Sequence, residues 1–313
     1  MTTSGAAHEA IGDRRSFALI ADGMPARGTD RAADNHGLFK RVLLGALARR
    51  DRQPSRLAAM ARRYLGIAEF NDLISSVEAG GRSDEIAALA EAVGVRFAFN
   101  GLENLASIGS RPVVLFANHP TGGGNVLGLS LLLARQFPAH RILGNQHMKF
   151  LRSLARNMIA VDPFCSTAAV NLDALIKLRR DFGTQYQALG VFPAGISSRI
   201  GVTGKISDRP WNDAFARIAR RHDALLVPVW FSGRNRLRYY LAARVRAELG
   251  FIALPAEFLR LRGQTITVNI GRPIAPDALR TIPGRDAQLS FLRAAVYALG
   301  NERGTAGAKE PAP

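Results

Sequence analysis

The chain has 313 residues, 47% of them hydrophobic and 21% charged, which suits one large or two small globular domains. Its 42 Lys and Arg against 25 Asp and Glu give a net charge of +17, which attracts nucleic acid, an anionic membrane surface or an acidic carrier protein. The single cysteine, Cys165, excludes an intramolecular disulfide and is consistent with a reducing cytoplasm, and no apolar run reaches the roughly 18 residues of a membrane-spanning helix.

The N-terminal part of the chain divides into two stretches. Residues 1–35 show little periodicity and are interpreted as a flexible tail. Residues 36–100 are predicted to form a basic amphipathic helical segment, because apolar residues such as Leu38 and Val42 recur at helical spacing among Lys and Arg. Such a helix could pack on the core with its basic side solvated, or lie in an anionic membrane interface.

From residue 64 onward, helices and strands are expected in turn. Helices are predicted at 64–79, 84–93, 126–136, 148–157, 168–180, 211–221, 237–249 and 288–299, and strands at 95–99, 113–116, 141–143, 158–161, 188–192, 224–231 and 265–270. The alternation predicts an α/β domain over residues 101–300, with a mixed, largely parallel sheet flanked by helices and preceded by the basic amphipathic helices. Residues 301–313 are interpreted as a second tail.

A histidine occupies the junction between one strand and the helix that follows it. His119 follows the apolar run 113–117 with only Asn118 between them, and it precedes a run of three glycines. Ligands bind at the carboxyl ends of strands in α/β sheets, and a neutral imidazole there can take a proton from a nucleophile. The run lacks the Gly-Lys-Ser/Thr of a phosphate-binding loop, and no His/Cys/Asp group has metal-ligand spacing. From this stretch alone, His119 could be a catalytic base or a structural residue of the core, and we expect no metal or other cofactor.

Two further strand ends carry arginines. The first runs from Phe192-Pro193-Ala194-Gly195 to Ser198 and Arg199, and the second from Val227-Pro228-Val229 to Gly233-Arg234-Asn235. Guanidinium groups bind phosphate or carboxylate in a fork geometry. The three strand ends could converge on one anionic substrate, although each arginine alone could equally be a solvated surface charge.

In this order, the stretches resemble the glycerolipid and lysophospholipid acyltransferase superfamily, and within it the hemolysin-like or ornithine-lipid-type branch. The resemblance rests on Asn118-His119-Pro120-Thr121-Gly122-Gly123, Phe192 to Arg199, Gly204 to Trp211, Val227-Pro228-Val229 and Gly233-Arg234-Asn235, and it covers roughly residues 64–274. It implies an enzyme like a 1-acylglycerol-3-phosphate or lysolipid O-acyltransferase, acting in phospholipid or other lipid metabolism. The acyl donor would be a thioester on acyl carrier protein or coenzyme A.

The resemblance also implies roles for particular residues. His119 would be the general base, Gly195 and neighbouring amides would stabilise the oxyanion, and Arg199 would hold an acidic head group. The substrate-binding positions implied are Asn118, Gly122, Gly123, Phe192, Pro193, Gly195, Ser198, Arg199 and Arg234. The expected setting is cytoplasmic, peripheral on the inner face of the cell membrane, with a lysolipid-like acceptor, an anionic membrane surface and no nucleic acid as partner.

One catalytic position departs from the family pattern. The branch has an aspartate six residues after the histidine, where this chain has Asn125. An aspartate would hold the imidazole tautomer and stabilise the imidazolium, whereas an amide brings no charge. Three outcomes are open: another carboxylate, Asp162 or Asp208, serves instead; the acceptor needs less base strength; or the protein is a weakened or silent relative that binds lipid or acyl carrier protein.

Overall fold

The computed structural model describes residues 64–145, 152–161, 168–201, 203–245 and 247–301. The expected amphipathic helices before residue 64, most of the second tail, Asp162 and Cys165 lie outside the described residues. Among the residues described, no helix is both long enough and apolar enough to cross a membrane.

A seven-stranded sheet with the order β1-β9-β8-β2-β5-β3-β4 forms the centre of the molecule. Its strands are β1 (Arg96–Asn100), β2 (Val113–Ala117), β3 (His140–Asn145), β4 (Met158–Val161), β5 (Ala188–Val191), β8 (Leu225–Phe231) and β9 (Thr265–Ile270). Neighbouring strands pair in parallel except β8 and β9, which are antiparallel. The prediction of a mixed, largely parallel sheet is therefore confirmed.

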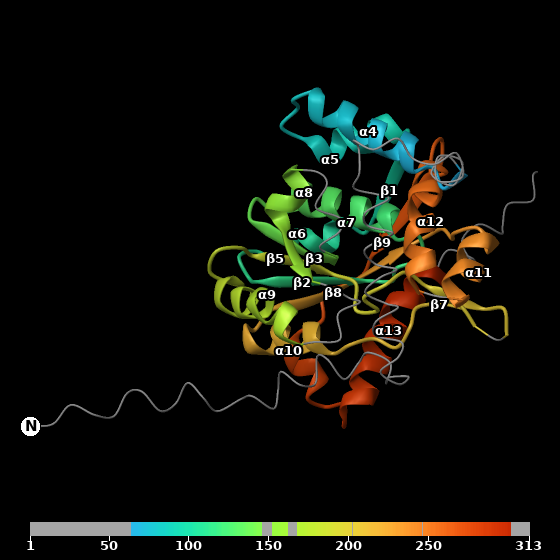
Figure 1. Ribbon diagram of the computed structural model, residues 1–313. Helices are drawn as coiled ribbons and strands as arrows, with labels where there is room; N and C mark the ends of the chain where they lie inside the picture. The colour runs from blue at the N-terminus through green and yellow to red at the C-terminus, as the bar shows by residue number, and fades with distance from the viewer. Residues whose placement is uncertain (1–63, 146–151, 162–167, 202, 246, 302–313) are drawn as a thin grey trace, which may run out of the picture.

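Helices cover both faces of this sheet (Figure 1). They are α4 (Ile67–Ala79), α5 (Glu85–Val93), α6 (Glu103–Ala106), α7 (Gly123–Gln136), α8 (Arg152–Asn157), α9 (Ala168–Asp181), α10 (Ala214–Arg221), α11 (Leu237–Val245), α12 (Ala247–Leu259) and α13 (Arg285–Asn301), with a 3-10 turn at Pro276–Leu279. A short antiparallel hairpin, β6 (Arg199–Ile200) with β7 (Ile206–Ser207), lies outside the main sheet.

The two faces are built from alternate residues of each strand, as the pleat of a strand requires. Along β2, Val113, Leu115 and Ala117 belong to one core cluster and Val114 and Phe116 to the other. The first cluster includes residues of α5 and α7, and the second includes residues of α9, α10 and α13. All five β2 side chains are fully buried, so β2 lies at the centre of a three-layer arrangement.

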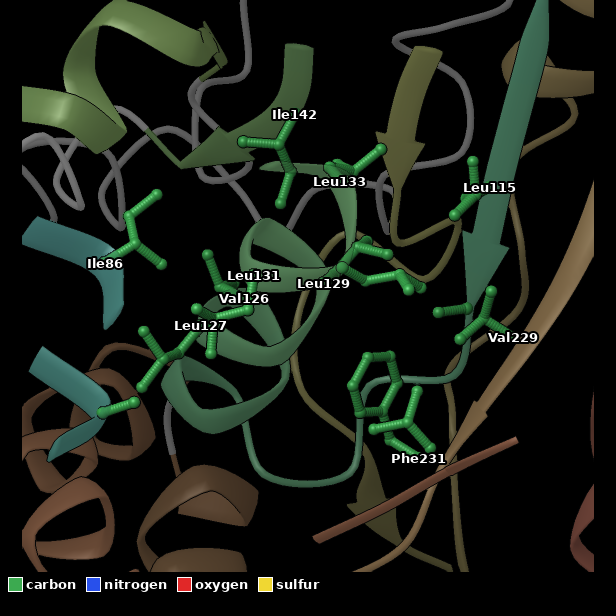
Figure 2. Packing of buried hydrophobic residues seen from close by; sticks show 14 of the residues in the cluster. Ile86, Leu115, Val126, Leu127, Leu129, Leu131, Leu133, Ile142, Val229 and Phe231 are labelled. Atoms are coloured by element: carbon green, nitrogen blue, oxygen red, sulfur yellow. The ribbon is translucent and has the colours of Figure 1, made fainter. Parts of the chain in front are cut away.

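Helix α7 is the element that brings a helix N-terminus to the end of β2. It is almost wholly apolar, and its side chains from residue 126 to residue 133 are buried. Figure 2 shows Leu129 beside the β-strand side chains Leu115 and Val229, while Leu127 lies on the side of α5. This packing fixes the start of α7, and therefore the turn that contains His119, against the sheet.

Two elements differ from the expected boundaries. β1 lies before residue 101, where the α/β domain was expected to begin, and pairs in parallel with β9 from Arg96 to Asn100. The helix expected at 237–249 is two helices, α11 and α12, and α12 extends to Leu259 through Pro255. The two helices pack against each other, and α12 also packs on α4 and α7.

Candidate active site

The three strand ends that carry the sequence motifs lie side by side in the structure. β2 pairs in parallel with both β5 and β8, and Phe116 is in register with Val191 on one side and Pro228 on the other. The chain segments that follow these strands therefore emerge at one edge of the sheet. The His119 ring stacks on the Phe192 ring with 4.1 Å between centroids, so the first two segments are in direct contact.

The buried carboxylate of Asp208 connects these segments. Its Oδ1 accepts hydrogen bonds from the His119 backbone N–H at 3.2 Å and from the Ser198 hydroxyl at 2.5 Å, and its Oδ2 accepts one from Trp211 Nε1 at 3.1 Å. The Ser198 N–H in turn donates to the His119 carbonyl at 2.8 Å. Asp208 thus holds the backbone of His119 rather than its imidazole, so the described contacts give it no part in fixing the ring tautomer.

Asn125 lies in the first turn of α7 and is fully buried. Its Oδ1 accepts a hydrogen bond from the Thr121 N–H at 2.7 Å, which satisfies one donor in front of the helix. Its Nδ2, the Nδ1 of His119 and the hydroxyl of Thr121 are buried and have no hydrogen-bond partner among the described residues. Buried polar atoms without partners are rare in folded proteins, and here three occur within seven residues.

Burial sets the protonation state of the histidine. Removal of the His119 imidazole from water lowers its pKa to about 3, because the charged form loses its hydration and gains no compensating carboxylate. The ring is therefore neutral near pH 7, which is the form that can accept a proton. The carboxylate that contacts His119, that of Asp208, contacts its main chain only.

The glycine run allows helix α12 to lie against the start of α7. A Cβ on Gly122 would come within 2.8 Å of Ser197 Oγ and 2.9 Å of Leu254, and the residue has a φ of +70° that favours glycine. A Cβ on Gly124 would lie 2.6 Å from Leu261. These glycines are thus required for packing between elements, and a substrate contact at Gly122 or Gly123 stays a prediction.

Several predicted binding residues have their polar groups engaged within the protein. The Asn118 side chain donates to the Phe231 carbonyl at 3.0 Å and accepts from the Phe231 N–H at 2.7 Å, which ties the end of β2 to β8. The Gly195 N–H donates to the Phe192 carbonyl at 2.9 Å and closes a turn, and Pro193 is buried beneath it. In contrast, the N–H groups of Gly123 and Gly124 have no acceptor among the described residues.

The predicted arginines lie on two sides of this site. Arg199 lines a cavity of about 230 Å³ together with Ile200, Arg209, Tyr240, Ala243 and Arg244. No carboxylate lines it, and Nη1 of Arg199 is buried without a hydrogen-bond partner among the described residues. Arg234 is exposed on the loop after β8, where Gly233 approaches Thr121.

Sequence reasoning missed the contribution of α11 to this cavity. Arg244 and Tyr240 come from α11, and Arg209 directly follows Asp208 in the stretch from Gly204 to Trp211. The density of arginines between residues 234 and 246 was the available signal. It could not be assigned to a site, because only the fold brings α11 beside the β6–β7 hairpin.

Comparisons with known proteins found chains that are similar to this one. A lyso-glycine lipid O-acyltransferase of Phocaeicola vulgatus is 30% identical over 226 residues, covering 69% of this chain and 77% of that protein. A second of the same name, from Bacteroides thetaiotaomicron, is 30% identical over 205 residues, covering 61% and 70%. The crystal structure of a 1-acyl-sn-glycerophosphate acyltransferase from Thermotoga maritima aligns over 88% of this chain and 90% of that one, with a TM-score of 0.44 and 14% identity.

The model of the acyltransferase family matches residues 48–306, a range that contains all seven strands of the sheet and the three strand ends with His119, Arg199 and Arg234. With the sequence relatives, this match confirms the resemblance stated from the motifs, and the chain belongs to the acyltransferase family.

Proposed function

We propose that the protein transfers a fatty acyl group from a thioester, on acyl carrier protein or coenzyme A, to a hydroxyl of a lysolipid-like acceptor. The observation that carries this proposal is a buried, neutral His119 at the meeting point of three strand ends, in a chain of the acyltransferase family. The two similar proteins named as lyso-glycine lipid O-acyltransferases support a lipid acceptor.

In the proposed reaction, His119 takes the proton of the acceptor hydroxyl while the oxygen attacks the thioester carbonyl carbon. The carbon–sulfur bond then breaks, and the thiol leaves with the proton that the imidazole returns. Nε2 would accept the proton, since Nδ1 is the buried nitrogen without a partner. The unengaged N–H groups of Gly123 and Gly124, at the N-terminus of α7, are the donors that we propose for the developing oxyanion.

The arginine-lined cavity supports an acidic head group on the acceptor. Arg199, Arg209 and Arg244 line it without a carboxylate, so an anion there would gain interactions that no internal group supplies. An excess of positive charge over the whole chain also favours an anionic membrane surface and an acidic carrier protein as partners. We propose a peripheral protein on the cytoplasmic face of the membrane.

The test is acyl transfer by the purified protein with both donors and a panel of lysolipids. We expect a product with at least one acceptor, and a loss of about a hundredfold or more in His119→Gln, which removes the base. His140→Gln is the matched control, because His140 is also buried but its Nδ1 contacts the Phe137 carbonyl, away from the three strand ends. No product with any acceptor, or equal rates in the parent and His119→Gln, would refute the proposal.

A second candidate is a weakened or silent relative that binds lipid or acyl carrier protein without efficient turnover. The unpartnered Nδ1 of His119 favours it, as does the amide at position 125. Oδ1 of Asn125 accepts a hydrogen bond from the Thr121 N–H, so the group that remains is the Nδ2 amide, which is a donor. An aspartate at this position would instead offer a second acceptor oxygen.

Asn125→Asp separates the two candidates. A carboxylate near the imidazole favours its charged form, so kcat should rise about tenfold or more and the acid limb of the kcat/KM profile should move to higher pH. Asn125→Ala is the control, because it removes the acceptor for the Thr121 N–H without adding a carboxylate. An inactive parent with an active Asn125→Asp variant would establish the silent relative, and rapid turnover by the parent would exclude it.

A further inference from the structure

Helix α11 presents an apolar ridge to solvent. The side chains of Leu237, Leu241 and Val245 are 60%, 54% and 74% exposed. They are four residues apart, so they lie along one face of the helix. The opposite face is buried, since Tyr239, Tyr240 and Ala243 form a small core cluster with Ala253 of α12. Among the described residues the ridge therefore has no partner, while the opposite face of the same helix is packed against the protein.

Arginines flank this ridge. With 100° between successive residues, Arg244 lies on one side of the ridge and Arg238 on the other. Arg238 contacts Glu257 at 3.3 Å and lies 5.6 Å from the ring centre of Tyr64, which is itself 71% exposed. The side chains of Arg234, Arg236 and Arg244 are exposed and form no ion pair with a described acidic residue. Residues 234–247 contain no acidic residue at all.

A second exposed apolar pair, on α9, lies among different charges. On α9, Leu172 and Ile176 are 36% and 47% exposed and are also four residues apart. The charges of α9 are mixed, however, and Arg180 pairs with the neighbouring Asp181 at 2.5 Å. In Figure 1, α9 lies well away from α11. Apolar side chains four residues apart are thus exposed on both helices, but of the two only α11 carries no acidic residue among its basic ones.

The ridge is also next to the arginine-lined cavity. Arg244, Tyr240 and Ala243 of α11 line that cavity, so the helix that carries the ridge forms one wall of the proposed head-group site. A lipid held at the ridge would therefore have its polar end beside Arg199 and Arg209 on the same side of the protein.

We propose that the α11 ridge and its flanking arginines dock the protein on an anionic phospholipid surface, with the ridge in the interface and the guanidinium groups on lipid phosphates. A convex line of separate apolar side chains among long basic ones suits an interfacial helix, because arginine stems cover apolar surface while their heads stay at the phosphate level. The exposed Tyr64 fits the same level. This inference rests on the proposed lipid acceptor and names the surface through which the protein reaches it.

Co-sedimentation of the full chain with vesicles tests this surface. The vesicles are phosphatidylcholine with and without phosphatidylglycerol, and the variant combines Leu237→Ala, Leu241→Ala and Val245→Ala. We expect it to bind anionic vesicles about tenfold more weakly or worse, because much of the inserted apolar area is lost. Leu172→Ala with Ile176→Ala is the matched control and should bind as the parent does. Arg244→Gln should weaken binding about fivefold, and Arg220→Gln on α10, the charge-matched control, should not.

Three results would overturn the proposal. One is a ridge variant that binds anionic vesicles as tightly as the parent while its circular dichroism is unchanged. Another is a parent that binds vesicles equally with and without phosphatidylglycerol. The third is a parent dimer that the ridge variant converts to monomer without a change in vesicle binding, which would assign the ridge to a second copy of the chain. Vesicle binding is measured without turnover, so these failures are distinct from a failure of acyl transfer on a dispersed acceptor.

Discussion

Two buried carboxylates hold the regions of the proposed active site and the proposed membrane surface, and they do so with different partners. Asp208 holds the turn that contains His119, and its side chain accepts hydrogen bonds from a backbone N–H, a serine hydroxyl and an indole. Glu257 of α12 holds the loop before α11: it accepts from the Arg236 N–H at 2.8 Å and pairs with Arg238 at 3.3 Å and Arg260 at 3.4 Å. Neutral donors surround the first carboxylate, and guanidinium groups surround the second.

The exposure of these donors predicts how strongly each region depends on its carboxylate. The donors around Asp208 are themselves buried, so water cannot take the place of the carboxylate when Asp208 is substituted. Arg238 and Arg260 are partly exposed, with side chains 37% and 24% accessible, so water can solvate them when Glu257 is changed. The His119 region should therefore depend strongly on its carboxylate, and the α11 region only weakly.

The largest expected effect is that of Asp208→Ala. It leaves the Ser198 hydroxyl, the Trp211 indole and the His119 N–H without their acceptor, so the free energy of unfolding should fall by about 3 kcal/mol or more. Urea unfolding measures this fall. Asp277→Ala is the control, since its ion pair with Arg280 is exposed and should contribute less than about 0.5 kcal/mol. Equal effects of the two variants would contradict the role assigned to Asp208.

The second-largest expected effect is a loss of stability at low pH. The pKa of His119 is lowered from 6.5 to about 3, so between these values the unfolded chain binds a proton that the native protein does not. The free energy of unfolding therefore carries no penalty from His119 well above pH 6.5 and decreases as the pH falls toward 3. The decrease amounts to about 2 kcal/mol between pH 6.5 and pH 5. Unfolding of His119→Gln at both pH values should show a correspondingly smaller decrease.

The lowered pKa values of His140 and His222 act with the same sign, so the parent's total decrease should exceed the part due to His119. The informative quantity is therefore the difference between the parent and His119→Gln. An identical pH dependence in both proteins would show that the imidazole is hydrated in solution.

The sequence predicted the sheet and the convergence of its strand ends well, for a local reason. β2, β5 and β8 belong to short apolar runs that stop at Asn118, Pro193 and Ser232, so each strand and its end can be recognised from neighbouring residues alone. Parallel strands then bring their carboxyl ends to one edge, which placed His119 beside the Phe192 segment.

What could not be predicted depends on contacts between distant segments. Asp208 was considered as a partner for the imidazole, but the β6–β7 hairpin directs its carboxylate to the main chain of His119 instead. α12 was missed because Pro255 interrupts its pattern, since proline removes a helix hydrogen bond. Without α12, the packing reason for Gly122 and Gly124 was also hidden, because Leu254 and Leu261 are their neighbours only in the fold.

The smallest expected effect is that of Glu257→Gln, which keeps the shape of the side chain and removes its charge. The amide oxygen can still accept from the Arg236 N–H, and the partly exposed Arg238 and Arg260 can turn to water. The free energy of unfolding should therefore fall by about 1 kcal/mol, clearly less than in Asp208→Ala. Glu69→Gln is the control, because its pair with Arg262 is exposed on both sides. If Glu257→Gln instead costs as much as Asp208→Ala, the arginines beside α11 are held as rigidly as the His119 turn, and the contrast between the two regions fails.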